Sequence, residues 1–417
     1  MQVLFSTMIV RVARLILALT ILAFAGAAQT APAFSTLYSF TGGANGANPG
    51  AEVIIETNGS LFGTTPYGGT EGYGTVFELT PGTPWTQAVL YSFGGGNDGA
   101  NPAAALTLGT GGVLYGTTAA GGSSGNGMVF QLTPPAKTGD PWTETVLYSF
   151  KGGTADGSGP QGSVTRIANG VLYGTTFTGG AGAAGTVFQL TPPTSAGAWT
   201  ETVIYNFKGG KDGSGPESGV IVSGGELYGT TCCGTVGGTV FKLVPKGGGG
   251  WGKQILVSFS SYSQGAFPYG SLAMNSSGVV YGTTTAGGAS GAGILFSLTP
   301  GATGEPYTMA TIHSFTNGTD GGAPYGGLTL GSHGELYATV TAGCSFGNGG
   351  VLLFTPPAHG TGAWSETVLY NFMGTTDGSE PFAGVTLGSS SNTLYGTTTF
   401  GGAAGPADYG TVFELIL

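Results

Sequence analysis

The sequence predicts an all-β fold, a seven-bladed β-propeller with four antiparallel strands in each blade. One motif, Leu-Tyr-Gly-Thr-Thr or a close variant, recurs at intervals of 53–58 residues. Its aromatic position is occupied by Phe62, Tyr115, Tyr173, Tyr228, Tyr281, Tyr337 and Tyr395. Between successive copies lie short runs of β-branched and aromatic residues, bounded by glycine and proline, and such runs are typical of strands joined by hairpins.

Residues 101–150 show the order of the elements within one repeat. The runs 103–108, 113–118, 128–133 and 142–150 are separated by Gly111-Gly112, by the loop at Gly121-Gly122 and by Pro134-Pro135. In chain order we name these predicted strands a, b, c and d. A parallel β-helix has shorter coils without these hairpins. A row of separate sandwiches is not expected, because about 55 residues give too small a core for each.

The two ends of the chain predict how the ring closes. Thr36 to Phe40 reads as a lone strand d, whereas Thr411 to Leu417 reads as a strand c with nothing after it. We therefore expect the N-terminal strand to complete the last blade, which would also cover an edge that otherwise invites aggregation.

Composition narrows the function classes. Charged residues make up 7% of the chain and the formal net charge is −10, with no basic stripe. Nucleic acid and anionic membrane surfaces are therefore not expected partners. Residues 1–28 resemble a secretory signal, with Arg11 and Arg14 before the apolar run 15–25 and small residues at Ala25-Gly26-Ala27. We expect one propeller domain at 29–417, without a membrane span, in an exported protein that is periplasmic, extracellular or attached to the cell surface.

The full repeat resembles a known family. Its pattern is Leu-Tyr-Gly-Thr-Thr-x-x-Gly-Gly, then Gly-Thr-Val-Phe-x-Leu-Thr-Pro, then Val-Leu-Tyr-Ser-Phe, and it covers roughly residues 34–417. It is similar to the Gloeobacter/Verrucomicrobium ("GloVer") repeat of bacterial choice-of-anchor proteins. The resemblance implies an exported bacterial protein built from tandem repeats. It implies no catalytic residues, and the anchor segment of that family is not expected because the chain ends within strand c.

The clearest difference between repeats lies in the loops that join strand d to the next strand a. Each loop ends in a proline, and the following residue is Tyr269, Tyr325 and Phe382 in the last three repeats. Together with the loop acids Asp320 and Asp377, these rings are our candidate ligand-binding residues, a stacking platform for a sugar or peptide. The alternative is that the rings only pack at the start of strand a.

The same loops contain a recurrent Asp-Gly pair, at Asp98, Asp156, Asp212, Asp320 and Asp377. Asp-Gly is a turn signal, because aspartate bonds its own backbone and glycine takes positive φ. The functional alternative is a ring of carboxylates at the channel mouth that could hold Ca²⁺. We expect no cofactor and no metal site, and calcium is left open.

The remaining candidates have structural interpretations. Trp85, Trp142, Trp199, Trp251 and Trp364 hold one fixed position and are expected to pack. Arg166 replaces an apolar residue of strand a, which predicts a salt bridge with a neighbouring blade. His313, His333 and His359 fall on different elements, so neither a zinc cluster nor a catalytic triad is expected. A disulfide from Cys344 to Cys232 or Cys233 is left open.

These observations lead to three hypotheses. The first is a non-enzymatic binding module for a glycan or another extracellular polymer. The second is a structural or protein-interaction module of the cell envelope, with an envelope protein as its partner. The third and weakest is a polysaccharide lyase or hydrolase, which would need two carboxylates about 5–10 Å apart in a cleft.

Overall fold

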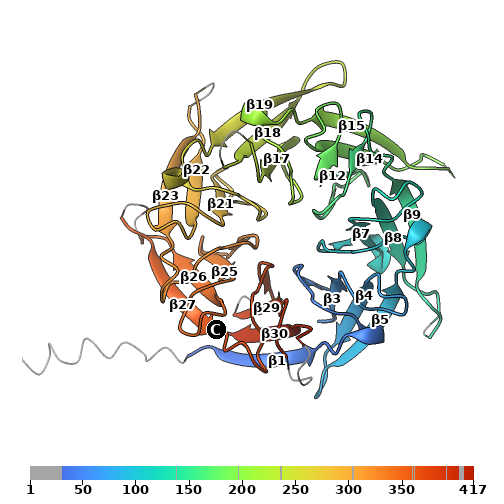
Figure 1. Ribbon diagram of the computed structural model, residues 1–417, viewed down its shortest axis with the longest axis horizontal. Helices are drawn as coiled ribbons and strands as arrows, with labels where there is room; N and C mark the ends of the chain where they lie inside the picture. The colour runs from blue at the N-terminus through green and yellow to red at the C-terminus, as the bar shows by residue number, and fades with distance from the viewer. Residues whose placement is uncertain are drawn as a thin grey trace, which may run out of the picture.

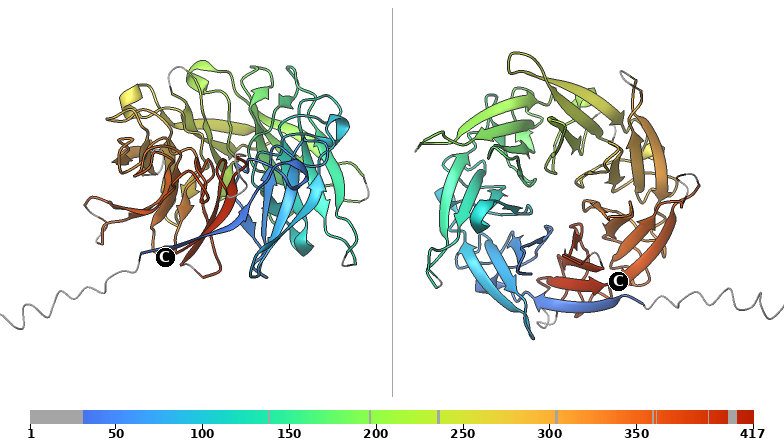
Figure 2. Two further views of the ribbon diagram at one scale, coloured as in Figure 1. Left: turned by 60° about the horizontal axis from the view of Figure 1, so that its bottom comes forward. Right: turned by 180° about the vertical axis from the view of Figure 1, so that it is seen from behind.

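The computed structural model describes residues 31–417 except 138, 196, 235–236, 303–304, 359, 361, 391 and 403–407. The predicted signal segment 1–28 and His359 therefore lie outside the described residues. Seven four-stranded antiparallel sheets are arranged around a central axis, as Figure 1 shows. The chain is thus a seven-bladed β-propeller, and a view from behind shows the same ring (Figure 2).

Each blade has its four strands in the chain order a, b, c, d, counted outward from the axis. Strands a are β2 (Ile54–Ile55), β6 (Thr107–Leu108), β11 (Thr165–Arg166), β16 (Ile221–Ser223), β20 (Ala273–Met274), β24 (Thr329–Leu330) and β28 (Thr386–Leu387). Strands b are β3 (Leu61–Thr65), β7 (Leu114–Thr118), β12 (Leu172–Thr176), β17 (Glu226–Thr231), β21 (Val280–Thr284), β25 (Leu336–Val340) and β29 (Thr393–Thr398).

The outer half of each blade contains the longer strands. Strands c are β4 (Thr75–Thr80), β8 (Met128–Thr133), β14 (Thr186–Thr191), β18 (Thr239–Pro245), β22 (Ile294–Thr299), β26 (Gly350–Thr355) and β30 (Thr411–Ile416). Strands d are β5 (Thr86–Ser92), β9 (Thr143–Ser149), β15 (Thr200–Asn206), β19 (Trp251–Ser258), β23 (Thr308–Ser314), β27 (Ser365–Asn371) and β1 (Ala33–Ser39). We number the blades 1 to 7 from β2–β5 to the blade formed by β28, β29, β30 and β1.

The ring closes as the sequence predicts. Strand β1 pairs antiparallel with β30, from Ala33 opposite Ile416 to Ser39 opposite Thr411. Figure 1 shows the N-terminal strand lying outside the C-terminal strands of blade 7. The ring of Phe34 stacks on Tyr370 of blade 6 at 3.9 Å, so the first strand also packs against a second blade.

The glycine of the repeated motif is required by packing between strands b and c. A β-carbon at Gly174 would lie 2.4 Å from Cζ of Phe188, and the same conflict recurs in five other blades. Blade 6 differs at both positions at once, because Ala338 there lies opposite Leu352. The larger residue on strand b is thus accommodated by a smaller residue on strand c.

The first threonine of the motif joins neighbouring blades. The hydroxyl of Thr175 donates to the carbonyl of Ser218 in the next blade at 2.8 Å. Equivalent bonds run from Thr64, Thr117, Thr283, Thr339 and Thr397 to Ala104, Gly162, Gly326, Ala383 and Ala51. These acceptors lie between the loop proline and strand a. The predicted inner runs therefore form only two or three ladder residues, since their first part bonds the neighbouring blade instead.

The hydrophobic core lies between blades. The cluster around Phe150 and Phe188, for example, combines residues of blades 2 and 3, and every other seam has its own cluster. The tryptophans cross the same seams, as predicted from their fixed position. Trp199 of blade 3 packs edge-on against Tyr115 of blade 2 at 6.4 Å, and Trp85, Trp142, Trp251 and Trp364 make the matching contact.

The structure corrects one prediction and answers one question that the sequence left open. Arg166 makes no ion pair with any described residue, and its Nε is buried without a hydrogen bond, so the predicted salt bridge is wrong. The residue as a whole is half-buried. Cys232 and Cys233 form a disulfide with each other, whereas Cys344 is free and buried.

Candidate functional site

A cavity of about 320 Å³ lies on the propeller axis, because all seven blades contribute residues to its wall. This size is at the lower end of the range for small-molecule sites. The wall is built from the segments between the loop prolines and strands a. In each segment, the first and the third residue after the proline determine whether that part of the wall is aromatic, acidic or lined by small residues.

The first residue after each proline forms the upper layer of the cavity. Tyr269, Tyr325 and Phe382 occupy this position in blades 5, 6 and 7, and all three line the cavity. Tyr269 and Tyr325 stack with ring centroids 4.6 Å apart, and Phe382 meets Tyr325 edge-on at 5.1 Å. The three rings are partly exposed. The structure therefore brings the predicted aromatic residues together in one continuous wall that faces a cavity.

Glu217 continues this layer in blade 4. Its Oε1 accepts a hydrogen bond of 2.8 Å from the hydroxyl of Tyr325. Burial raises the pKa of the Glu217 carboxyl, and the bond from Tyr325 opposes that rise. The residues at this position in blades 1 and 2 are small, Gly50 and Ala103, and Pro66 and Tyr67 of blade 1 also line the cavity.

The third residue after each proline forms the floor. It is small in six blades, namely Ala105, Ser163, Gly219, Ser271, Gly327 and Gly384, and it is Glu52 in blade 1. The Glu52 side chain crosses toward blades 6 and 7. A β-carbon at Gly384 would lie 2.4 Å from Glu52 Oε1, and one at Gly327 would lie 2.9 Å away. The channel is thus narrowed by one carboxyl group.

Burial raises the pKa of Glu52 to about 7, opposed by a hydrogen bond from the backbone N–H of Gly384. Protein atoms surround the carboxyl, although the residue as a whole keeps some contact with solvent. Near neutral pH this group exists in both protonation states, so it can donate or accept a hydrogen bond. The cavity therefore combines an aromatic wall with two carboxyl groups, one at its rim and one at its floor.

The structure does not bring Asp320 and Asp377 to this cavity, since neither is among the residues that line it. Each bonds its own blade instead. Asp377 is buried and accepts from the hydroxyl of Tyr370 and the N–H of Met373. Asp98, Asp156 and Asp212 bond a strand-d tyrosine and a loop N–H in the same way.

This pattern confirms the turn interpretation of the Asp-Gly pairs. The five carboxylates are distributed over five seams and do not converge at the mouth, so they form no shared calcium ring. His333 is almost fully exposed on the turn before β25. It does not belong to the group of potential metal ligands that contains His313 of β23.

Sequence reasoning missed Glu52 as a site residue. Its signal was present, because Glu52 is the one charged residue among the third positions after the prolines. Glu217 was visible as the acidic member of the first positions, but its contact with Tyr325 two blades away could not be read from the repeat.

A family model of the Gloeobacter/Verrucomicrobia repeat matches residues 27–236 and 140–352. The chain belongs to this repeat family. No curated protein matches it. Within the described residues, no helix is long and apolar enough to cross a membrane.

Solved structures share the fold of this repeat protein at low sequence identity. The extracellular domain described as part of a one-component system from B. thetaiotaomicron has a TM-score of 0.56 and 10% identity, over 93% of this chain and 42% of that one. An ancestral GH74 enzyme has a TM-score of 0.52 and 13% identity, over 89% and 51%. A protein described as a 6-phosphogluconolactonase from Bacteroides uniformis has a TM-score of 0.50 and 16% identity, over 81% and 88%. At these identities the likeness shows the fold alone.

Proposed function

We propose that this repeat protein is an exported binding module for a glycan, and that the axial cavity is its binding site. The observation that carries the proposal is the continuous wall of Tyr269, Tyr325 and Phe382, partly exposed in a cavity that also contains Glu217 and Glu52. Sugar rings present apolar C–H faces that stack on aromatic rings and hydroxyls that donate to carboxylates. Aromatic rings and carboxyl groups are both present in this cavity.

The charge of the site narrows the class of glycan. Two carboxyl groups in a chain of net charge −10 disfavour acidic polymers such as polyuronates. A neutral or amino-containing sugar fits better, since hydroxyl and ammonium groups both donate to carboxylates. The cavity volume of about 320 Å³ favours recognition of a short segment or a chain end over a long stretch of polymer.

Binding of the purified protein to neutral, amino-containing and acidic oligosaccharides tests the proposal by calorimetry. We expect saturable binding of a neutral or amino sugar. Tyr269→Ala, Tyr325→Ala and Phe382→Ala should each weaken it roughly 5–30-fold, the equivalent of about 1–2 kcal/mol for a lost stacking contact. Tyr262→Ala is the matched control, because Tyr262 is an exposed aromatic of the loop before β20 that does not line the cavity.

A folded protein that binds no sugar in the panel would contradict the proposal and favour the alternative of an envelope protein-interaction module. Binding that survives all three aromatic substitutions would place the site elsewhere.

Hydrolysis of the bound glycan is a second candidate, which rests on Glu52 and Glu217 sharing one cavity. A carboxyl group with a pKa of about 7 suits a general acid. The same panel tests this candidate by chromatography of the sugars after incubation. Cleavage by the wild type that is lost in Glu52→Gln, with binding retained, would support hydrolysis. Sugars that stay intact would contradict it and leave binding as the proposed function.

A further inference from the structure

Two seams between blades share one polar arrangement. In each, a tyrosine near the end of strand d bonds the loop aspartate that follows it, and the second residue of the next strand d is a glutamate close enough to interact electrostatically with both. Between blades 1 and 2 these are Tyr91, Asp98 and Glu144. The hydroxyl of Tyr91 donates to Asp98 Oδ1 at 2.5 Å, and Oε1 of Glu144 is buried without a hydrogen bond. Tyr148, Asp156 and Glu201 repeat this arrangement between blades 2 and 3.

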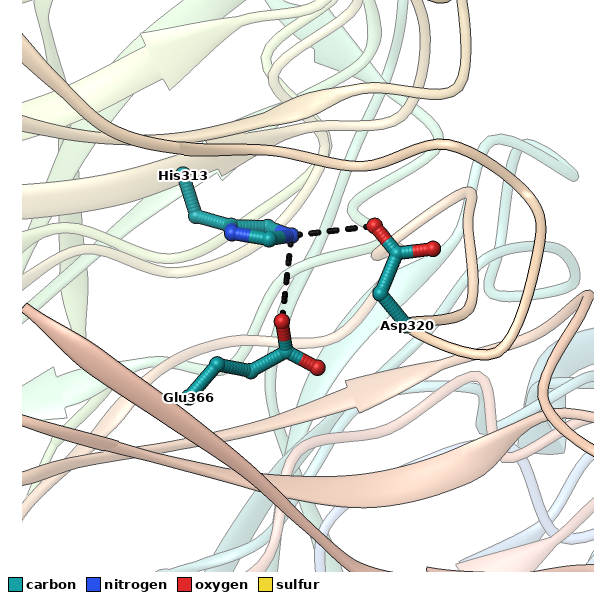
Figure 3. Close-up of side chains that lie close together, drawn as sticks. All are labelled: His313, Asp320 and Glu366. Carbon is teal, nitrogen blue, oxygen red and sulfur yellow. Dashed lines mark hydrogen bonds and ion pairs between the residues drawn. The ribbon is translucent and has the colours of Figure 1, made fainter.

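The seam between blades 5 and 6 differs by one residue, because histidine replaces tyrosine. Nε2 of His313 on β23 lies 3.1 Å from Asp320 Oδ2 and 3.5 Å from Glu366 Oε2 on β27. Figure 3 shows the imidazole nitrogen directed at both carboxylates. All three potential ligand atoms lie within 4.8 Å of one another, and no other such group of histidine, cysteine and acidic residues occurs in the described part of the chain.

We propose that His313, Asp320 and Glu366 bind one divalent transition-metal ion at this seam. Such ions lie about 2.0–2.2 Å from nitrogen and oxygen ligands, so two ligands of a tetrahedral ion are roughly 3.4 Å apart. The separations of 3.1 and 3.5 Å from Nε2 are close to this spacing, and the two carboxylate oxygens lie within 4.8 Å of each other. One imidazole and two carboxylates neutralise a doubly charged ion and leave a fourth position for water.

The surroundings hold the ligands in place before an ion arrives. Phe315 packs edge-on against the imidazole at 4.8 Å, and Phe354 of blade 6 lies 5.4 Å away. The backbone N–H and the hydroxyl of Thr316 both donate to Asp320, which fixes its carboxylate. Such supporting contacts are typical of metal ligands. The side chains of His313, Asp320 and Glu366 are 22, 14 and 22% exposed, so an ion can enter from solvent.

The choice of ion follows from the donor atoms. Ca²⁺ and Mg²⁺ prefer oxygen ligands alone, whereas an imidazole suits zinc and its neighbours in the first transition row. Because Asp320 and His313 belong to blade 5 and Glu366 to blade 6, the ion would also link two blades. We therefore expect it to stabilise the folded ring in addition to being bound.

Calorimetry with Zn²⁺ tests the proposal on untagged, chelator-treated full-length protein at pH 7.5. We expect one ion per chain, a higher Tm in Zn²⁺ and little response to Ca²⁺. His313→Tyr should abolish binding while the protein stays folded, because tyrosine occupies the equivalent position between blades 1 and 2. Glu366→Gln gives a second, nearly isosteric test, and both variants should lose the rise in Tm.

The repeat also offers a gain-of-site variant. Tyr91→His places an imidazole beside Asp98 and Glu144 and should raise the stoichiometry to two ions per chain. Failure of this variant to gain an ion would overturn the assignment of binding to the seam geometry. Absence of one-to-one binding by folded wild type, or binding that His313→Tyr and Glu366→Gln leave unchanged, would overturn the proposal itself.

Discussion

The hydroxyl of Tyr325 donates a hydrogen bond of 2.8 Å to Oε1 of Glu217, and so joins blade 6 to blade 4 across the mouth of the channel. The ring of Tyr269 from the intervening blade stacks on Tyr325 at 4.6 Å. One polar contact and one stacking contact therefore fix the same tyrosine, and the wall of the cavity is preorganised from three separate blades.

Tyr325→Phe should keep the aromatic wall and remove only the bond to Glu217. Since that bond opposes the effect of burial, the pKa of Glu217 should rise further in the variant. Titration of the glutamate carboxyl carbons by NMR measures this, with Glu217→Gln to identify the signal. An unchanged or lower pKa of Glu217 would show that the hydrogen bond does not form in solution.

Raising the pH from about 4.5 to about 7 should lower the free energy of unfolding. Burial raises the pKa of Glu52, Glu144 and Glu201 from 4.5 to about 7, and the charge of Asp98 or Asp156 adds to the rise in the two seam glutamates. Below about 4.5 each group is protonated in both states. Between the two values only the unfolded state ionises fully, so folding becomes less favourable as the pH rises.

Denaturant unfolding across this pH range measures the effect. Glu144→Gln should flatten the profile and stabilise the protein at pH 8 by about 1 kcal/mol, a figure reduced for the partial exposure of the group. Asp212 and Asp320 do not affect stability in this pH range. Their pKa values are lowered, so the stability that their ionised forms contribute is lost only when the pH falls below the usual aspartate pKa near 3.8. A pH profile identical in Glu144→Gln and wild type would contradict this prediction.

Gly174→Ala should destabilise the propeller by about 1–3 kcal/mol, since the new methyl group overlaps the ring of Phe188. Phe188→Leu alone should also destabilise it, because a cavity is left. The double variant reproduces the Ala338 and Leu352 pair of blade 6 and should cost at least about 1 kcal/mol less than the sum of the single changes. Gly247→Ala, with open space around the glycine, is the control and should be near neutral.

Removal of residues up to Ser39 should cause a large loss of stability, because the deletion exposes β30 and removes the ring of Phe34 from Tyr370. Thermal unfolding and light scattering measure the fall in Tm and the resulting aggregation. A synthetic peptide of residues 31–42 should partly restore the Tm when added in excess. A truncated protein as stable as the full chain would show that the β1–β30 pairing contributes nothing to closure.

The repeat spacing predicted the ring and the strand order, because both depend on a local pattern that recurs seven times. Closure followed from the strand types at the two ends of the chain, and the packing role of the tryptophans followed from their fixed place in five repeats. The aromatic residues of the cavity were found in the same way, as a departure from the repeat at one position. What could not be predicted depends on distances across the ring. Glu52 reaches blades 6 and 7 only because the channel is narrow at that level, and Glu366 meets His313 only through the packing of one blade on the next.

The threonine hydroxyls that join adjacent blades donate their hydrogen bonds to main-chain carbonyls, which every amino acid supplies. The residue next in sequence to each carbonyl, on its N-terminal side, is the one that forms the upper layer of the cavity. Attachment of a blade to its neighbour is thus independent of the side chain that the blade presents to the axis. Duplicated blades can diverge at that position without losing assembly, so seven modules that remain interchangeable as building parts can still acquire individual recognition chemistry.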